Sequence, residues 1–223
     1  MSATAQQGRT PLNSNRRRGG KQAQINGRAT EAAFEATAKR YEHEELLKWL
    51  KTGAPVAKGA NGFRAADKGP PDYQIDLLLD DGLPPRSIWI EVKSQTHKIG
   101  QGMRADHKLV KKHQRRFMLE RLAVGVPTLV LVKIEQIADW DKTPPRMAEH
   151  KGGWWLIPIC WWEDGTNSES LTLADLDERG ARCPDLWAPG EPATAKSQPD
   201  WLGALRVLDA RDDCPWLPIW GGE

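Results

Sequence analysis

The chain has 223 residues, with 32 Lys and Arg against 30 Asp and Glu and a net charge of +2. This length favours one core domain of about 130–150 residues with extensions over two full domains. Three widely spaced cysteines (Cys160, Cys183 and Cys214) argue against a disulfide framework or a clustered zinc site. No apolar run approaches the roughly 18–20 residues of a membrane span, so we expect a cytoplasmic protein with no membrane partner.

Charge is unevenly distributed along the chain. The first 30 residues contain six basic residues and no acid, whereas residues 163–223 contain thirteen acids and five bases. A basic front with an acidic rear predicts a polyanionic partner that binds on one side. Residues 1–26 are nearly free of apolar side chains, so we expect a disordered basic arm. There Arg16, Arg17 and Arg18 either bind DNA phosphates or only keep the chain soluble.

The next segment, Arg28 to Lys51, is predicted to be a helix because it is rich in Ala, Glu, Leu and Lys and is followed by Gly and Pro. Its inward stripe carries Glu31, Phe34 and Tyr41. Glu31, with Glu35 one turn on, is either an acid favoured by the helix dipole or an extra carboxylate that reaches a metal site.

A short strand near Pro55–Lys58 precedes the central prediction, which is an antiparallel hairpin. Residues 73–79 have strand character, residues 80–85 are dense in turn residues, and apolar side chains alternate with others over residues 88–93. Glu91 and Lys93 therefore share one face, beside an acid on the other arm. Two carboxylates and an ammonium together favour a divalent cation, unless they form only a solvated strand face with turn acids.

A second helix is predicted from about Asp106, as N-cap, to Val124, before Gly125. Two residues interrupt its apolar rows. Gln114 is either a hydrogen-bonded core amide or a side chain that orients the attacking water or a phosphate, and for His113 we expect packing or a phosphate contact. The predicted DNA-binding cations around this helix are Lys98, Arg104, Lys108, Lys111, Lys112 and Arg115.

The remaining elements are two strands and a tail. Residues 127–134 are nearly all apolar, which predicts a central strand covered on both faces, and residues 153–159 predict another strand. Residues 163–223 are expected to form an irregular acidic extension packed on the core, with one short helix at 171–179. Its tryptophans are expected to anchor it to the core, because acidic surroundings repel a phosphate backbone; the alternative is stacking on bases.

Pro71-Asp72 followed by Glu91-Val92-Lys93 resembles the PD-(D/E)XK nuclease signature. Across residues 26–162 the chain is most similar to RecU-type Holliday junction resolvases. This resemblance is carried by Glu31 and Tyr41 on the first helix, Asp72-Tyr73, Glu91-Val92-Lys93, His113-Gln114, the Gly-Val-Pro turn before the apolar strand, and the Trp-Trp-Leu-Ile-Pro segment. It implies an α/β fold with a restriction-endonuclease-like core over residues 27–162, in which a mixed sheet is flanked by helices.

The resemblance also implies the roles of the site residues. Asp72 and Glu91 hold Mg²⁺ with the main-chain carbonyl of Val92, Mn²⁺ can substitute, and Lys93 positions the nucleophilic water. Glu31 completes the acidic cluster through water, and Gln114 steadies the site. Such chemistry needs a hydroxide near neutral pH and neutralisation of charge on phosphorus, both of which a divalent metal supplies.

The chain departs from the RecU pattern at two places. The interval between Val56 and Asp72, where RecU proteins carry a junction-penetrating stalk, is short, and the interval between Asp72 and Glu91 is long. Asp76 lies in phase with Asp72 and closer to Glu91 in sequence, so it is a rival metal ligand. We favour Asp72 because it lies between Pro71 and Tyr73, as the signature requires.

Together these observations predict a metal-dependent, structure-selective endodeoxyribonuclease that resolves four-way DNA junctions by paired nicks. Two symmetric nicks require two sites related by a two-fold axis, so a homodimer is expected. The alternatives are a general duplex or flap nuclease on the same fold, and a DNA-binding protein without catalytic activity.

Overall fold

The computed structural model describes residues 14–52, 56–59, 62–65, 71–78, 85–98, 101–137, 152–163, 170–186, 198–216 and 219; within these ranges the side chains of 14–24, 56–59, 62–65 and 137 are not described. A six-stranded mixed sheet in the order β1-β4-β5-β7-β8-β10 forms its centre. The pair β5 and β7 is parallel, and the other neighbours are antiparallel. This confirms the predicted mixed sheet with flanking helices.

The strands of the sheet are β1 (Leu47–Lys51), β4 (Tyr73–Leu77), β5 (Arg86–Lys98), β7 (Thr128–Ile137), β8 (Gly153–Pro158) and β10 (Ala181–Cys183). The helices are α1 (Ser14–His43), α2 (Lys112–Leu122), α3 (Ile159–Glu163), α4 (Leu173–Arg179) and α5 (Trp201–Asp209), with the 3-10 helix η1 (His107–Leu109). Two small pairs, β2 (Val56–Gly59) with β3 (Gly62–Ala65) and β6 (Arg104–Asp106) with β9 (Ser170–Thr172), complete the described elements.

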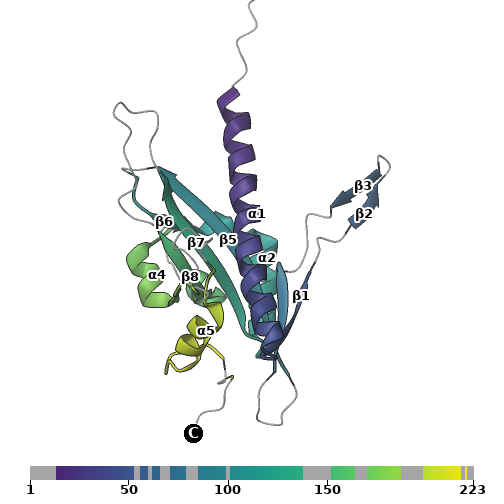
Figure 1. The fold of residues 1–223 in the computed structure, drawn as a ribbon, viewed down its shortest axis with the longest axis vertical. Helices are drawn as coiled ribbons and strands as arrows, with labels where there is room; N and C mark the ends of the chain where they lie inside the picture. Colours follow the sequence, from purple (N-terminus) through teal and green to yellow (C-terminus); the bar gives the residue numbers. More distant parts are fainter. Residues whose placement is uncertain are drawn as a thin grey trace, which may run out of the picture.

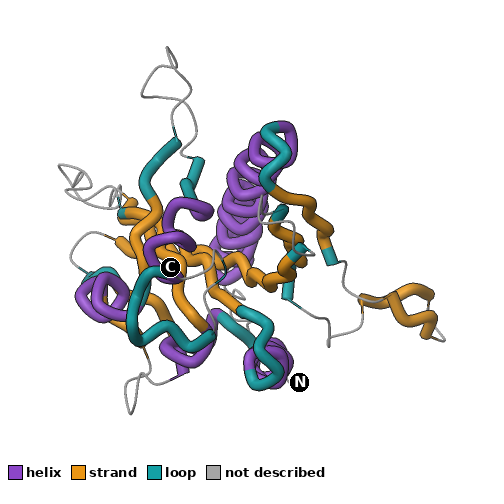
Figure 2. The backbone as a smooth tube through the Cα atoms, turned by 90° about the horizontal axis from the view of Figure 1, so that it is seen from below, coloured by secondary structure: helices purple, strands orange, loops and turns teal. Residues whose placement is uncertain are grey.

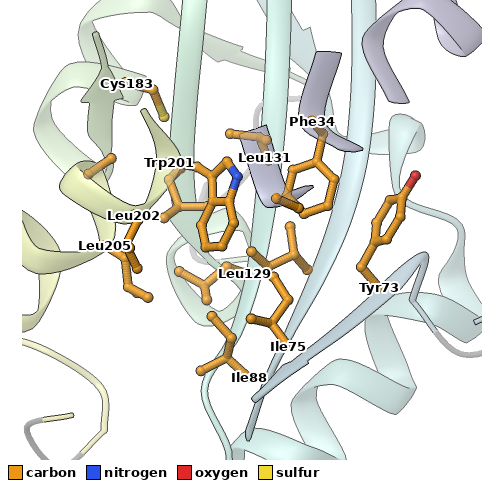
Figure 3. Packing of buried hydrophobic residues seen from close by; sticks show 14 of the residues in the cluster. Phe34, Tyr73, Ile75, Ile88, Leu129, Leu131, Cys183, Trp201, Leu202 and Leu205 are labelled. Atoms are coloured by element: carbon orange, nitrogen blue, oxygen red, sulfur yellow. The ribbon is translucent and has the colours of Figure 1, made fainter. Parts of the chain in front are cut away.

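Helices cover both faces of the sheet. On one face α1 and α5 bury Phe34 and Trp201 against inward residues of the strands, including Ile88 and Leu129 (Figure 3). On the other face α2, α3 and α4 pack on Val130 and its neighbours in a second cluster. Residues of β7 alternate between the two clusters, so the prediction of a central strand covered on both faces is confirmed.

The first helix differs from its predicted bounds at both ends. It begins at Ser14, so the backbone of residues 14–26 is helical where a disordered arm is expected, and this end extends past the sheet in Figure 1. Residues 1–13 lie outside the described residues. The apolar part of the inward stripe is confirmed, because Phe34 is fully buried and Tyr41 nearly so, whereas Glu31 is partly exposed.

The prediction that the first helix continues to Lys51 is wrong. Helix α1 ends at His43, Glu45 adopts φ 58°, and the chain enters β1. Each residue from Leu47 to Lys51 pairs with β4, and Leu47 is fully buried. Sheet pairing and burial outweigh the helix propensity of Leu and Lys, and also the cost, of roughly 1–2 kcal/mol, of a left-handed non-glycine residue.

The central hairpin is confirmed. Strands β4 and β5 are antiparallel, with Tyr73 opposite Ile90 and Leu77 opposite Arg86. Tyr73 and Ile90 are buried on the α1 face, which leaves Glu91 and Lys93 on the face covered by α2. The strand predicted at 153–159 is also confirmed as β8.

The second predicted helix is interrupted. Asp106 caps η1 by accepting a hydrogen bond from the Lys108 N–H at 2.8 Å, and α2 begins only at Lys112. The buried Val110 between them has an extended backbone, so the chain follows the core instead of continuing one helix. The helix ends at Leu122, two residues before the predicted Val124. Gly125 terminates it as expected, because it has φ 83° and its N–H donates to the Leu122 carbonyl at 2.9 Å.

The C-terminal region is more regular than expected. It supplies β9, α4, β10 as an edge strand of the sheet, and α5 (Figure 1). The predicted helix at 171–179 is confirmed as α4. Trp201 is fully buried and Trp216 nearly so, as expected for anchors, whereas Trp187 and Trp220 lie outside the described residues.

A small hairpin, β2 with β3, stands apart from the sheet in both Figure 1 and Figure 2. It includes the short strand predicted near Pro55–Lys58. Within the described part of the chain, no helix is long and apolar enough to cross a membrane.

Candidate active site

Strand register brings the signature carboxylates together. One step beyond the Tyr73–Ile90 pair, the Asp72 N–H donates to Glu91 Oε2 at 3.1 Å. In return, the Val92 N–H donates to Asp72 Oδ2 at 3.0 Å. These reciprocal bonds fix the two acids side by side where β4 begins.

Lys93 supplies a positive charge beside these two acids. Its ammonium donates a hydrogen bond to Glu91 Oε1 and lies 3.7 Å from Asp72 Oδ2. Burial acts to lower the pKa of Lys93, but the charges of Glu91 and Asp72 outweigh it and raise that pKa. Lys93 is therefore a fixed positive charge beside two acids.

Glu91 is fully buried, unlike Asp72. Burial raises its pKa, Lys93 lowers it and the Asp72 charge raises it, and together they bring the pKa of Glu91 to about 7. A carboxylate held in this way gains strongly from a second cation, because a buried charge is costly unless it is paired.

Gln114 reaches the site from α2. Its Nε2 donates to Glu91 Oε1 at 2.6 Å, and its own oxygen accepts from the Lys111 N–H at 3.2 Å. The buried amide thus links the start of α2 to the buried carboxylate. Gln114 is thus a buried, hydrogen-bonded amide whose partner is Glu91. Its proposed contact with the attacking water or a phosphate stays a prediction.

Asp76 does not join the site. It lies opposite Ser87, accepts a hydrogen bond from that hydroxyl, and lies 3.4 Å from Gln74 Nε2. The Gln74–Trp89 pair separates it from Glu91 along the sheet. Register therefore places Asp72, and not Asp76, beside Glu91.

Glu31 belongs to a second charged cluster, between α1 and β1. Lys51 donates to Glu31 Oε2 at 2.9 Å and to Glu35 Oε1 at 2.8 Å, and the Tyr73 hydroxyl donates to Glu35 Oε1 at 2.8 Å. Glu31 does not contact Asp72 or Glu91 directly, but its charge is among those that raise the pKa of Lys93. It lies within electrostatic range of the site and not in direct contact with it.

Lys51 is the partner of these two acids, and the sequence patterns do not indicate it. Composition predicts that the residue ends a helix, whereas it lies on β1 opposite Tyr73. The pattern Leu-Lys-Trp-Leu-Lys, which alternates briefly in polarity, is the available signal for a strand.

The predicted DNA-binding cations divide into three groups. Lys98, Arg104, Lys108, Lys111 and Lys112 are exposed along β5, β6, η1 and the start of α2. Arg115 is half-buried and forms an ion pair with Glu163 at 2.9 Å, so part of its charge is already compensated. Arg16, Arg17 and Arg18 lie in the first turns of α1, where side chains are not described.

The donor set fits a magnesium ion with few protein ligands. Among the described residues, no group of three or more His, Cys, Asp and Glu side chains is arranged to hold a metal. Mg²⁺ at phosphoryl-transfer sites commonly uses one or two carboxylates, with water and phosphate oxygens completing the shell. Asp72 and Glu91 supply two such carboxylates. The third proposed ligand is the main-chain carbonyl of Val92, the residue between Glu91 and Lys93.

Comparisons with known proteins add no family assignment. No protein-family model matches the chain, and no curated protein matches it.

Proposed function

We propose that the chain is a metal-dependent endodeoxyribonuclease with a restriction-endonuclease-like core. One observation carries this proposal: Asp72 and the buried Glu91 lie on adjacent strands, with the Lys93 ammonium between them. Two hard oxygen donors and a fixed cation are what hydrolysis of a phosphodiester requires around its phosphorus.

Each residue has a distinct role in this proposal. Asp72 and Glu91, with the Val92 carbonyl, hold Mg²⁺ or Mn²⁺, which supplies an activated water and offsets phosphate charge. Lys93 orients the water as a point charge, and Gln114 holds Glu91 through its 2.6 Å hydrogen bond. Glu31, which is paired with Lys51, adds a negative charge within electrostatic range of Lys93.

The proposed substrate is a four-way DNA junction cut by a homodimer with paired nicks. The order of the elements around Asp72 and Glu91 supports this choice. The β2–β3 hairpin stands apart from the sheet (Figure 2) and lies in the interval that forms the junction-penetrating stalk in RecU-type resolvases, although this interval is shorter here than in those proteins.

The test offers the purified protein a mobile four-way junction, a linear duplex and a flap, with and without Mg²⁺. We expect symmetric paired nicks in the junction that need Mg²⁺. Equal cutting of the duplex would show a general nuclease, and binding without cutting in any divalent metal would show a DNA-binding protein.

The matched variants are Asp72→Asn and Asp76→Asn. Both remove one carboxylate charge from the same strand face, but only Asp72 touches Glu91 and Val92. Loss of cleavage in Asp72→Asn with near-normal cleavage in Asp76→Asn supports the proposed site. Equal effects would contradict it.

A further inference from the structure

Strand β5 continues well beyond its catalytic lysine. It is 13 residues long, and four of its residues, Glu91, Lys93, Gln95 and His97, alternate onto one face. Lys93 bonds within the carboxylate pair. The other three each bind a partner in the segment that returns along residues 104–114.

The later a residue lies along β5, the earlier its partner lies in the segment 104–114. His97 Nε2 lies 2.8 Å from the Arg104 carbonyl oxygen, and Gln95 Oε1 accepts from the Asp106 N–H at 2.8 Å. Glu91 accepts from Gln114 at 2.6 Å. Side chains of β5 thus hold a segment that pairs with β9 through its backbone and not with β5 itself.

The held segment carries exposed cations. Arg104, Lys108, Lys111 and Lys112 are exposed, and we call them the basic rim. Between them Ala105 and Val110 are fully buried, so the backbone of the rim is anchored at apolar points as well. The backbone that carries these cations is therefore held by the same strand that carries Lys93.

We propose that Gln95 and His97 are positioning residues that hold the basic rim in register with Lys93, so that it binds the DNA phosphates flanking the cleaved one. This inference rests on the proposed nuclease function for the position of the cleaved phosphate. A hydrogen bond to the backbone of Asp106 or Arg104 fixes the rim without adding charge. An effect of Gln95 on DNA binding is therefore a positional effect.

The test measures DNA binding without cleavage, in EDTA, as a function of salt. Gln95→Met removes the acceptor without changing charge, and His97→Leu removes the hydrogen bond at Arg104. Thr96→Val is the control, because Thr96 accepts a similar bond from Asn26 Nδ2 at 3.0 Å without touching the rim. The double substitution Lys111→Gln/Lys112→Gln removes two rim charges directly.

We expect Gln95→Met to weaken duplex binding about 3–10-fold at moderate salt. The slope of log K against log salt should become shallower by about 0.9 for each DNA phosphate that the rim no longer neutralises. His97→Leu should act in the same direction. Combined with Lys111→Gln/Lys112→Gln, Gln95→Met should weaken binding by less than the product of the separate effects.

Two results would overturn the proposal. If Gln95→Met and His97→Leu match Thr96→Val in affinity and salt dependence, the rim is only a solvated face. If Mg²⁺ affinity, measured by calorimetry, falls in the same proportion as DNA affinity, Gln95 acts on the carboxylates instead. Binding is measured without cleavage, so the two proposals fail separately. A wild-type protein that binds but cuts no DNA would refute the proposed nuclease function, whereas the binding data on the variants would still decide whether Gln95 and His97 position the basic rim.

Discussion

Two clusters in this protein contain the same kinds of residue in different surroundings. Asp72, Glu91 and Lys93 lie beneath α2, whereas Glu31, Glu35 and Lys51 lie between α1 and β1. Each has two acids and one lysine. The Glu91 carboxylate is fully buried, while Glu35 is 26% exposed and Lys51 is 49% exposed.

The balance between burial and neighbouring groups moves the pKa values of the two glutamates in opposite directions. Burial raises the pKa of Glu91 beyond what Lys93 can offset. It also acts upward on Glu35, but the hydrogen bonds from Lys51 and Tyr73 outweigh it and lower the pKa of Glu35. In the first cluster burial disfavours the charged form of Glu91, which a metal ion would stabilise. In the second cluster, hydrogen bonds from Lys51 and Tyr73 already stabilise the charged form of Glu35.

The largest difference is expected between Glu91→Gln and Glu35→Gln. The first removes a proposed metal ligand, so Mg²⁺-dependent cleavage should fall by about 10²–10³-fold or more. The second removes an acid already paired with Lys51, so cleavage should change by less than about 10-fold. Single-turnover rates on a labelled junction measure both. Equal losses would mean that both clusters take part in the chemistry.

A smaller difference is expected between Lys93→Met and Lys51→Met. Lys93→Met removes the charge that orients water and leaves Glu91 without its ammonium, so the cleavage rate should fall by about 10²-fold. Lys51→Met removes two partly exposed ion pairs, with Glu31 and Glu35, so the free energy of unfolding should fall by less than about 1 kcal/mol. Cleavage rates and urea unfolding test this pair of variants. A large loss of cleavage in Lys51→Met would give that residue a direct role.

Gln114→Leu tests the link between α2 and the buried acid. It removes the donor to Glu91 while retaining an apolar side chain of similar size, so Mg²⁺ affinity or cleavage should fall by about 10-fold, as for other partners of ligating groups. Gln74→Leu is the control, because Gln74 lies on β4 and contacts Asp76 instead. Identical behaviour of the two variants would show that Gln114 is only a core amide.

The last effect concerns the pH dependence of stability. The folded-state pKa of Glu91 lies near 7, above its ordinary value of 4.5, so the associated stability is present below pH 4.5 and is lost as pH rises through 7. The difference in unfolding free energy between wild type and Glu91→Gln, measured without metal, should shift against wild type by on the order of 1–3 kcal/mol over that window. The Glu35 contribution has the opposite sign, because the pKa of Glu35 is lowered, and it is lost as pH falls below 4.5. A flat difference for Glu91→Gln would contradict its burial as the cause.

Much of the site could be predicted from local patterns. Alternation on residues 88–93 places Glu91 and Lys93 on one face, because the period of a strand is two residues. The four-residue spacing on the second helix places Gln114 with Met118 on its inner face, and both are buried. These predictions succeed because each depends only on the geometry of one element.

The pairings between elements could not be predicted in the same way. Helix propensity places Lys51 in a helix, but pairing with β4 makes it a strand residue beside Tyr73. Composition predicts an irregular tail, yet burial of Ala181 and Cys183 makes it an edge of the sheet, and burial of Trp201 anchors α5. In each case burial in the shared core outweighs a weak local preference.

The sequence by itself determined the hairpin, the face shared by Glu91 and Lys93, and the central strand, because regular backbone periods fix which side chains point together. The tertiary structure decided that Asp72 and not Asp76 lies beside Glu91, since that depends on the register of β4 against β5. It also decided that Glu91 is buried and Glu35 is not, because burial depends on which helix covers each face. That difference in burial, between residues of identical chemistry, separates the proposed metal site from an ion cluster that is stabilised by its own lysine and tyrosine.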